Sequence, residues 1–497
     1  MKKNNFLKNI LSGFGGQFIA IILGLIVPRF FISGYGSDVN GLISTITQIF
    51  TYMALLEAGV GQAAKNVLFK PVRENNKVEI NKWYSVALKY FRRLTIYYGI
   101  GVVTLALVLP YVIKTNVAPI TIFWVVLFEG LAGVTTFYFI QTPSILLTVD
   151  GKSYVNNNIT LINKIVGYIA KIVLAICGIN IIFLQLTYFL INVAKLFFYQ
   201  RYLRKNYTWL KYQKVDNSIK LKDRNSFVIT EIAWTIFSST DMIVLSTFLS
   251  TQLSSVYSVY NMIFTNLNVL LNAVYNSINY LLGYTYHEDI KKYEIVHDSF
   301  NSVFIGTMTC LMSICIYLTI PFVKLYTNGI TDIEYIYESL PVMFCLIQIL
   351  SWSRYVTGNL TALSGYAKKT SYISLAEAVT NISLSIILVN KYRIIGVTIA
   401  TVVALPLKVL WCLYVSDKKV MHRSYRKSIT ILGANYLLFF VNVVISRKIR
   451  LPIFSYGSFL FYGLVISSIV FAMGIIVNIT VNKDCALLIK NKLFKKK

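Results

Sequence analysis

Residues 40–69 read NGLISTITQIFTYMALLEAGVGQAAKNVLF, and residues 70–93 read KPVRENNKVEINKWYSVALKYFRR. The first part is apolar, carries no Lys or Arg before Lys65, and exceeds the roughly 20 residues that a helix needs to cross a hydrocarbon core. The second part is rich in Lys and Arg, which is typical of a cytoplasmic loop. The stretch therefore predicts a membrane-spanning helix that ends in the cytoplasm and is followed by a basic loop.

The whole chain has the composition of a polytopic membrane protein. It has 497 residues, of which 56% are hydrophobic and 14% charged, whereas a soluble protein carries about 25% charged residues. The formal net charge of +28 is spread over many short loops. We attribute it to the inner-face bias of membrane proteins and to contact with anionic membrane lipids, not to nucleic acid.

The lengths of the apolar runs predict an all-α fold with about fourteen membrane-spanning helices. In the first half of the chain we expect them at 9–33, 40–67, 91–113, 119–149, 155–177 and 180–203. In the second half we expect 226–250, 253–283, 296–323, 335–363, 371–390 and 394–416, with a last pair at 427–446 and 455–481. Most Lys and Arg residues fall in loops on one side of this arrangement, so both termini are expected in the cytoplasm.

The pattern of helices and loops in residues 1–210 recurs in residues 211–420. A long basic loop follows the second helix of each half, and a short turn, containing Gly151 or Gly365, follows the fourth. We therefore expect two six-helix lobes around a central cavity, related by an axis along the membrane normal because both have the same orientation. Residues 421–497 are expected to add two helices and a basic cytoplasmic tail.

Short motifs in and before the opening stretch resemble those of the Wzx-type flippases, the polysaccharide exporters of the multidrug/oligosaccharidyl-lipid/polysaccharide exporter superfamily. They are Asn40-Gly-Leu, Glu57-Ala-Gly-Val-Gly, Lys70-Pro71, Pro28-Arg29 and Gly34-Tyr35-Gly36. The resemblance implies two bundles that rock between inward-open and outward-open states. It also implies a cargo, an oligosaccharide repeat unit on a polyprenyl pyrophosphate, moved across a bacterial cytoplasmic membrane for capsule, exopolysaccharide or O-antigen assembly. A polysaccharide polymerase and glycosyltransferases are then the expected neighbours in the pathway.

Two polar helix faces are candidates for the wall of the cavity. On the predicted eighth helix, amides and a phenol fall within about 100° of one another and offer donors and acceptors for sugar hydroxyls: Asn261, Asn268, Asn272, Tyr275, Asn276 and Asn279. Thr45, Gln48 and Tyr52 form the counterpart on the predicted second helix. The alternative for the eighth helix is hydrogen bonding between helices, which such residues commonly provide.

Charged residues inside the predicted helices are functional candidates, because a charge at the bilayer centre costs roughly 3 kcal/mol unless it is paired or hydrated. The first lobe has a positive surplus, which suits a pyrophosphate. Arg29, with its planar fork, is the first candidate for binding it, followed by Lys195 and Arg354. The alternative for Arg29 is that it snorkels to the outer interface. Glu57 is expected to be an ion-pair partner within the lobe rather than a proton carrier.

The second lobe has a negative surplus, which suits a driving cation. Glu377 and Asn381 share a face of the predicted eleventh helix, and Thr398 lies on the twelfth. Oxygen ligands of this kind suit Na⁺, and a carboxylate alone can serve H⁺. The resemblance adds Asp241, because related flippases have a cation site between helices seven, eleven and twelve. The alternative is that Glu377 pairs with Lys408.

The sequence has no motif for catalysis: no Gly-rich phosphate loop, nucleophile elbow or metal-ligand spacing. His287, His297 and His422 are expected in or beside solvated cytoplasmic loops. We therefore predict a transporter, not an enzyme, with no metal and no cofactor apart from Na⁺ or H⁺ as a coupling ion. Two alternatives stay open: a multidrug/cation antiporter of the same superfamily, and a membrane-embedded glycosyltransferase or polymerase.

The charge distribution makes a direct prediction about topology. Reporter fusions at Asn76, Asn217, Asp289 and the C-terminus are expected to report the cytoplasm, and fusions at Thr115 and Asn328 the exterior, because basic loops are retained on the inner side. A reversed or mixed pattern would contradict the model of two lobes in the same orientation.

Overall fold

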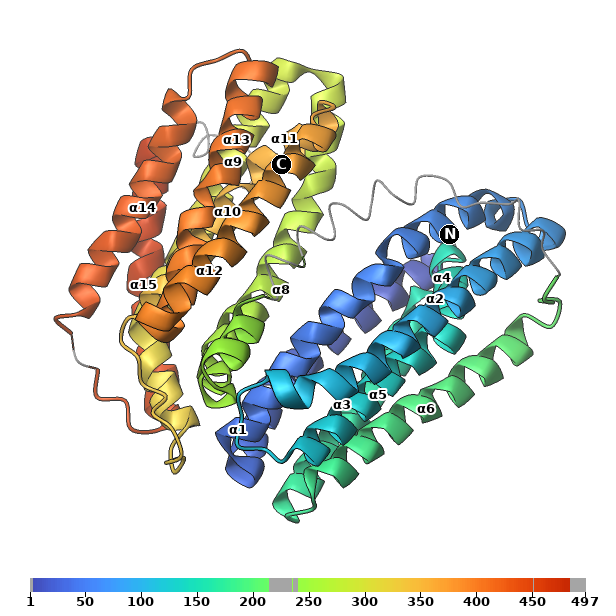
Figure 1. Ribbon diagram of the computed structural model, residues 1–497. Helices are drawn as coiled ribbons and strands as arrows, with labels where there is room; N and C mark the ends of the chain where they lie inside the picture. The colour runs from blue at the N-terminus through green and yellow to red at the C-terminus, as the bar shows by residue number, and fades with distance from the viewer. Residues whose placement is uncertain (1–2, 214–234, 236–239, 450, 483–497) are drawn as a thin grey trace. The chain divides into compact units, whose positions relative to one another are not determined.

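The computed structural model describes residues 3–213, 235, 240–449 and 451–482, and every regular element in these ranges is a helix (Figure 1). The predicted all-α fold is therefore confirmed. Ten helical segments of the described part are long and apolar enough to cross a membrane. The number of fourteen stays a prediction, since the expected helix 226–250 lies largely outside the described residues.

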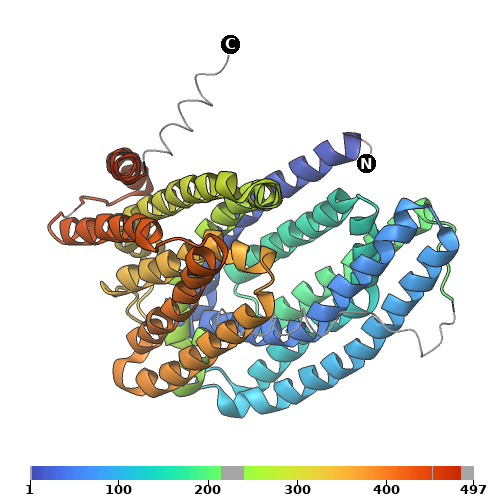
Figure 2. The same cartoon turned by 90° about the horizontal axis from the view of Figure 1, so that it is seen from above.

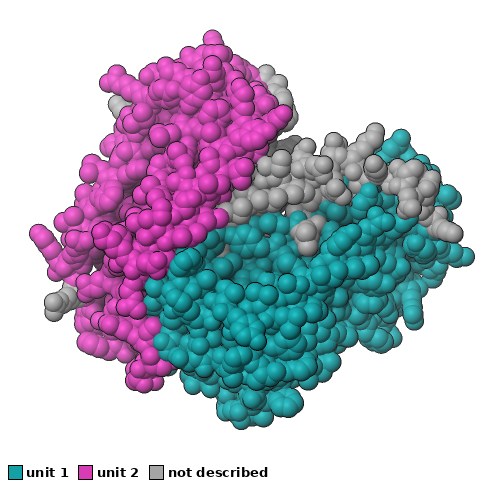
Figure 3. All heavy atoms as spheres, viewed as in Figure 1, with its two compact units in different colours: residues 1–256 teal, residues 257–497 magenta. Residues whose placement is uncertain are grey.

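The chain divides into two compact units, residues 1–256 and residues 257–497 (Figure 3). The division falls within helix α8, Thr251–Glu288. The boundaries that the sequence predicts at residues 210 and 420 stay predictions.

Unit 1 is a bundle of long helices in which α1 packs against α2, α3, α4 and α5, while α6 packs against α3 and α5. Its elements are α1 Lys3–Arg73, α2 Lys77–Val112, α3 Pro119–Thr135, the π-helical turn η1 Thr136–Ile140, α4 Gln141–Val149, α5 Ser153–Ile176 and α6 Ile181–Asn206. Two apolar cores hold the bundle. One surrounds Leu68, Phe91 and Leu146 near its predicted cytoplasmic end, and the other surrounds Leu42 and Val126.

Helix α1 contains both of the first two predicted spans. Its backbone leaves the helical conformation at Gly36, with φ 81° and ψ 171°. Glycine adopts a positive φ without steric cost, so the chain changes direction here without a loop. The break that the sequence predicts between residues 33 and 40 is therefore present at Gly36, where two helices meet without an intervening loop.

The basic loop predicted at residues 70–93 is wrong in its extent, because α2 begins at Lys77 and not at residue 91. Asn76 caps this helix, its side chain accepting a hydrogen bond from the backbone N–H of Glu79 at 3.1 Å. Ile80, Tyr84 and Ala87 are buried in the first core, so the basic segment is an amphipathic extension of the membrane helix. Lys77 and Lys82 remain on the exposed face.

Unit 2 is built around α9, which contacts α10, α11, α14 and α15. Besides most of α8, its elements are α9 Ile290–Tyr326, α10 Leu340–Ser353, α11 Tyr355–Leu363, α12 Ala367–Ala404, α13 Pro406–Leu413, the π-helical turn η2 Tyr414–Val420, α14 Arg426–Ser446 and α15 Tyr456–Val481. Helix α12 joins two predicted spans, and its backbone leaves the helical conformation at Arg393, with φ 51° and ψ −132°.

The last two helices are integrated into unit 2. Helices α14 and α15 lie side by side (Figures 1 and 2), and both contact α9. Asn435 of α14 and Asn478 of α15 exchange amide hydrogen bonds of 3.1 Å in both directions, and Ser302 of α9 donates to the same Asn478 side chain at 3.2 Å. This buried polar contact joins all three helices at one level.

The kink at Gly36 leads into a close junction between α1 and the first turns of α8. Thr251 donates a hydrogen bond to the Asp38 carboxylate at 2.6 Å, and Asn40 donates to Ser255 at 2.8 Å. Between these contacts the two backbones approach so closely that a Cβ atom on Gly41 would lie 1.7 Å from the carbonyl oxygen of Thr251. Only glycine fits at this position.

Gly41→Ala is therefore expected to destabilise the protein by about 1–3 kcal/mol or to prevent its folding, because the added methyl group forces α1 and α8 apart. The measurement is thermal unfolding of the purified protein in detergent. Gly433→Ala, on α14, is the matched control, because nothing lies within 4 Å of a Cβ atom there. It is expected to leave stability unchanged or to raise it by up to about 1 kcal/mol. Equal unfolding temperatures for the two variants would contradict the close approach.

Candidate functional site

The polar face of the second predicted helix lies on α1, within unit 1. Thr45 is buried, and Gln48 and Tyr52 are partly exposed. The Tyr52 hydroxyl shares a hydrogen bond with the hydroxyl of Thr240, and the adjacent Asp241 is close enough to act electrostatically on Tyr52. The structure thus brings a predicted cavity residue together with a predicted cation-binding residue that is 7% exposed.

Two carboxylates in unit 1 have amide partners. The side chain of Gln141, on α4, donates a hydrogen bond to Glu57, and Gln185, on α6, donates to Glu129, on α3, at 2.5 Å. Lys65 also acts electrostatically on Glu57, so the ion-pair role expected for Glu57 inside the lobe stays a prediction. An amide can satisfy a carboxylate oxygen without bringing a second charge into the membrane.

Lys171 of α5 belongs to the Glu129 cluster. Its ammonium group lies 4.2 Å from the centre of the Tyr188 ring and attracts the Glu129 carboxylate. The cluster therefore contains one charge of each sign. Lys195, which the sequence proposes for substrate binding, lies elsewhere on α6, beside Lys164 of α5. Arg29 is half-buried on α1.

Unit 2 contains a buried ion pair between two residues that the sequence assigns to different roles. Arg354, a predicted substrate residue, donates from Nη1 to the Oε1 atom of Glu377, a predicted cation ligand. Their side chains are 5% and 3% exposed. Lys408 of α13 is close enough to act electrostatically on both. The partner of Glu377 is thus Arg354, while Lys408 contributes a second nearby positive charge.

The other predicted cation ligands of unit 2 lie on α12. Asn381 donates from Nδ2 to the hydroxyl of Thr401 at 2.8 Å, whereas its Oδ1 atom is buried without a hydrogen-bond partner among the described residues. The hydroxyl of Thr398 donates to the carbonyl of Ile395, at 2.9 Å. Asp241 belongs to unit 1, so the four proposed ligands are divided between the two units.

The polar stripe of α8 has two kinds of members. Asn268 accepts a hydrogen bond from the indole N–H of Trp352 at 2.7 Å, and Tyr275 donates to the carbonyl of Tyr355 at 3.2 Å. These contacts join α8 to α10 and α11, as the interhelical alternative expects. Asn261 and Asn272 are partly exposed. Asn276 and Asn279 lie on α8, but their side chains are outside the described part, and the cavity role of the stripe stays a prediction.

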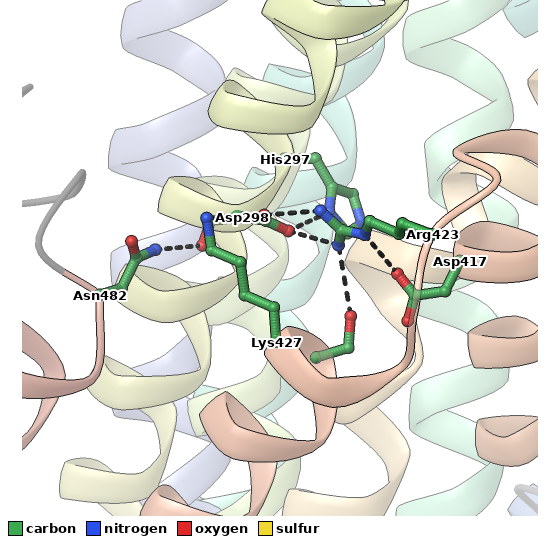
Figure 4. A network of polar contacts seen from close by, with 7 residues as sticks. His297, Asp298, Asp417, Arg423, Lys427 and Asn482 are labelled. Atoms are coloured by element: carbon green, nitrogen blue, oxygen red, sulfur yellow. Dashed lines mark hydrogen bonds and ion pairs between the residues drawn. The ribbon is translucent and has the colours of Figure 1, made fainter.

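A polar network that the sequence did not predict lies at the predicted cytoplasmic end of unit 2 (Figure 4). The Asp298 carboxylate of α9 accepts two hydrogen bonds from the Arg423 guanidinium, at 2.6 and 2.7 Å. It also forms an ion pair with the ammonium group of Lys427 at 3.1 Å. Arg423 also donates to Asp417 of η2 at 2.8 Å. Burial lowers the pKa of Arg423, but the two carboxylates outweigh this effect and raise it above its usual range, so the guanidinium remains charged.

His297 lies next to this network, and its position differs from the one expected in or beside a solvated loop. It is 0% exposed, not part of a solvated loop, and its Nδ1 atom lies 3.1 Å from the Asp298 carboxylate. The signal that could have located it is periodicity, because Tyr293, His297 and Phe300 repeat at helical spacing and are all buried.

A second polar contact, between a tyrosine and a carboxylate, lies at the predicted cytoplasmic end of unit 1. The Tyr207 hydroxyl, just after α6, donates to the Asp150 carboxylate at 2.5 Å, and Lys152 forms an ion pair with the same carboxylate at 2.7 Å. Burial, and then the hydrogen bond to Asp150, raise the pKa of the Tyr207 phenol. The phenol therefore stays protonated and remains a donor, which fixes the turn between α4 and α5 against the end of α6.

Comparisons with known proteins identify the fold. No family model matches the sequence, and no curated protein matches it. The structure of the lipid II flippase MurJ in an inward closed conformation matches with a TM-score of 0.66 at 17% sequence identity, covering 98% of this chain and 100% of that one.

Multidrug transporters match as well. An inward-facing multidrug resistance MATE family transporter of the MOP superfamily matches with a TM-score of 0.64 at 12% identity, covering 79% of this chain and 93% of that one. The MATE multidrug transporter DinF-BH matches with a TM-score of 0.62 at 14% identity, covering 85% and 97%. The chain therefore has the fold of the MOP-superfamily transporters.

The buried pair in unit 2 leads to a stability prediction. Glu377→Gln is expected to cost about 3–5 kcal/mol of stability, because it leaves the charge of Arg354 buried without its counter-charge. Combining it with Arg354→Met removes both charges and is expected to restore most of the loss. Thermal unfolding in detergent measures both effects.

The exposed Glu334→Gln serves as the control for the loss of one carboxylate, and it is expected to change stability by less than about 0.5 kcal/mol. If the double variant were no more stable than Glu377→Gln alone, the ion pair would not be what holds these two side chains in place.

Proposed function

We propose that this protein is a flippase for a lipid-linked oligosaccharide in a bacterial cytoplasmic membrane. The observation that carries the proposal is the extent of the structural match. The match to the lipid II flippase covers 98% of this chain and 100% of the flippase chain. The match to the MATE family transporter covers 79% of this chain and leaves about a fifth of it without a counterpart. A multidrug transporter fold alone does not account for the whole chain.

The proposed cargo is an oligosaccharide repeat unit on a polyprenyl pyrophosphate. The motifs around Asn40 and Glu57 that resemble Wzx-type flippases support this choice over lipid II itself. The partly exposed amides of the α8 stripe, Asn261 and Asn272, support it as well, because amides offer both donors and acceptors to sugar hydroxyls. A polysaccharide polymerase and the glycosyltransferases that build the unit would be its partners in the pathway.

The proposed mechanism is alternating access coupled to Na⁺ or H⁺. In unit 2 the Oδ1 atom of Asn381 is buried and has no hydrogen-bond partner among the residues that the structure describes, and a hard cation prefers such oxygen ligands. Thr398 and Glu377 are the neighbouring candidates on α12, and Asp241, in unit 1, is a separate candidate. A cation that bound to Glu377 would have to compete with Arg354 for the carboxylate. Binding of the cation would therefore weaken the ion pair between Arg354 and Glu377.

Deletion of the protein is expected to leave completed lipid-linked oligosaccharide on the cytoplasmic leaflet, with synthesis of the unit unchanged. A membrane-impermeant glycosidase, added to right-side-out and to inside-out vesicles, measures which leaflet holds the sugar. Purified protein in liposomes is then expected to move a fluorescent polyprenyl-pyrophosphate oligosaccharide between leaflets, and protein-free liposomes are the control.

Each alternative predicts a different result. If the unit is not made in the deletion strain, the protein is a transferase or polymerase. If the unit is exported normally and the reconstituted protein instead moves organic cations, the protein is a multidrug antiporter. Either result overturns the flippase proposal.

A further inference from the structure

Helix α5 has two chemically different faces. At 100° per residue, one face carries branched aliphatic side chains that fall within about 40° of a common direction and are 46–66% exposed: Ile162, Val166, Ile169, Val173 and Ile176. Such a stripe is suited to contact with lipid tails. Lys164 and Lys171 lie about 180–200° from it, and Lys164 is exposed there. An exposed ammonium group at this depth requires water or an anion, because hydrocarbon can solvate neither its charge nor its donors.

Lys195 of α6 lies beside Lys164. The two helices pack side by side (Figure 1), and Asn163 donates a hydrogen bond across this interface to the carbonyl of Ile191 at 2.8 Å. Lys164 follows Ser153, the first residue of α5, by eleven residues, and Lys195 precedes Asn206, the last residue of α6, by eleven. Both therefore lie about 16 Å from the cytoplasmic ends of their helices.

The two lysines lack the compensation that their neighbour Lys171 has. Lys171 has the Glu129 carboxylate and the face of the Tyr188 ring. Neither Lys164 nor Lys195 forms an ion pair or a hydrogen bond with any residue that the structure describes. Among the described residues, the charge that acts on Lys195 is the like charge of Lys164. Two adjacent cations in a membrane protein form a site that an anion would complete.

We propose that Lys164 and Lys195 together bind a phosphate or diphosphate group inside the membrane. The inference rests on the proposed function, which supplies the diphosphate of a polyprenyl-linked cargo as the ligand. A diphosphate has oxygen acceptors for several ammonium donors at once, and charge-assisted hydrogen bonds of this kind are strong away from bulk water. Lysine is a mobile point charge, so the pair can follow a headgroup as it moves along α5 and α6.

The same chemistry could come from a phospholipid headgroup, so the test must separate the two sources. Purified full-length protein in neutral-lipid nanodiscs is titrated with a fluorescent polyprenyl diphosphate. Phosphatidylglycerol, inorganic pyrophosphate and the uncharged polyprenyl alcohol are then used as competitors. Competition by phosphatidylglycerol at equal concentration would assign the site to lipid headgroups, whereas preference for the polyprenyl diphosphate would assign it to the cargo.

The variants are Lys164→Gln, Lys195→Gln and their combination, with Lys164→Arg and Lys195→Arg as conservative replacements. Each Gln variant is expected to weaken binding about tenfold, and the double variant more strongly, since each loses one charge-assisted hydrogen bond. The Arg variants keep the charge and are expected to bind within about threefold of the wild type. The matched control is Lys205→Gln, which replaces an exposed lysine at the end of α6. This variant is expected to bind the polyprenyl diphosphate as the wild type does.

Thermal unfolding without ligand separates binding from folding. Because two like charges repel, removing either one is expected to leave the unfolding temperature unchanged or to raise it. If the Gln variants bound as tightly as the wild type, or if Lys205→Gln lost as much affinity, the proposal would be overturned. A fall in unfolding temperature in both Gln variants would also overturn it, because the lysines would then support the fold.

The outcome also distinguishes this inference from the proposed function. If the wild-type protein bound no polyprenyl diphosphate at all, the flippase proposal would fail. If the wild type bound it and the double Gln variant bound it equally well, only the assignment to Lys164 and Lys195 would fail.

Discussion

The structure depends on one constraint: a lipid bilayer offers no hydrogen-bond partner to a polar side chain. Every polar group inside the membrane must therefore find its partner within the helix bundle. The described residues meet this requirement in several ways. Glu57 has the amide of Gln141, Arg354 has the carboxylate of Glu377, and Asn435 and Asn478 satisfy each other. These contacts determine which helix faces turn towards one another, because a rotated helix would expose a polar group to lipid.

The same constraint gives meaning to the polar groups that remain without a partner. In a soluble protein an isolated lysine is hydrated and needs no explanation. Among the residues that the structure describes, Lys164 and Lys195 have no carboxylate partner, and the buried Oδ1 atom of Asn381 has no donor. In a transmembrane helix such groups mark places where a ligand would be stabilising. The first pair suits an anion and the second residue suits a cation.

The polar networks at the predicted cytoplasmic ends differ in character from those within the membrane. Asp298, Arg423, Asp417 and Lys427 form a connected set of charges that joins α9, η2 and α14 (Figure 4). In unit 1, Asp150, Lys152 and Tyr207 join the ends of α4, α5 and α6. With the predicted topology, water and lipid headgroups would lie close to these positions, where charges cost less than at the bilayer centre. These contacts hold the helix ends together.

The fold class and most of the helices follow from the sequence alone, which also predicts the kinds of residue that would carry the proposed function. Apolar runs of sufficient length can form only helices in a bilayer, and the spacing of Asn and Tyr on α8 follows from 3.6 residues per turn. What it did not determine is which polar groups meet. Asn268 and Tyr275 face α10 and α11, Arg354 pairs with Glu377, and His297 is buried beside Asp298. Helical periodicity gives the face on which a side chain lies, whereas its partner depends on which helix packs against that face. That choice is made by close approaches such as Gly41 against Thr251, which bring together residues some two hundred positions apart, and only the tertiary structure contains it.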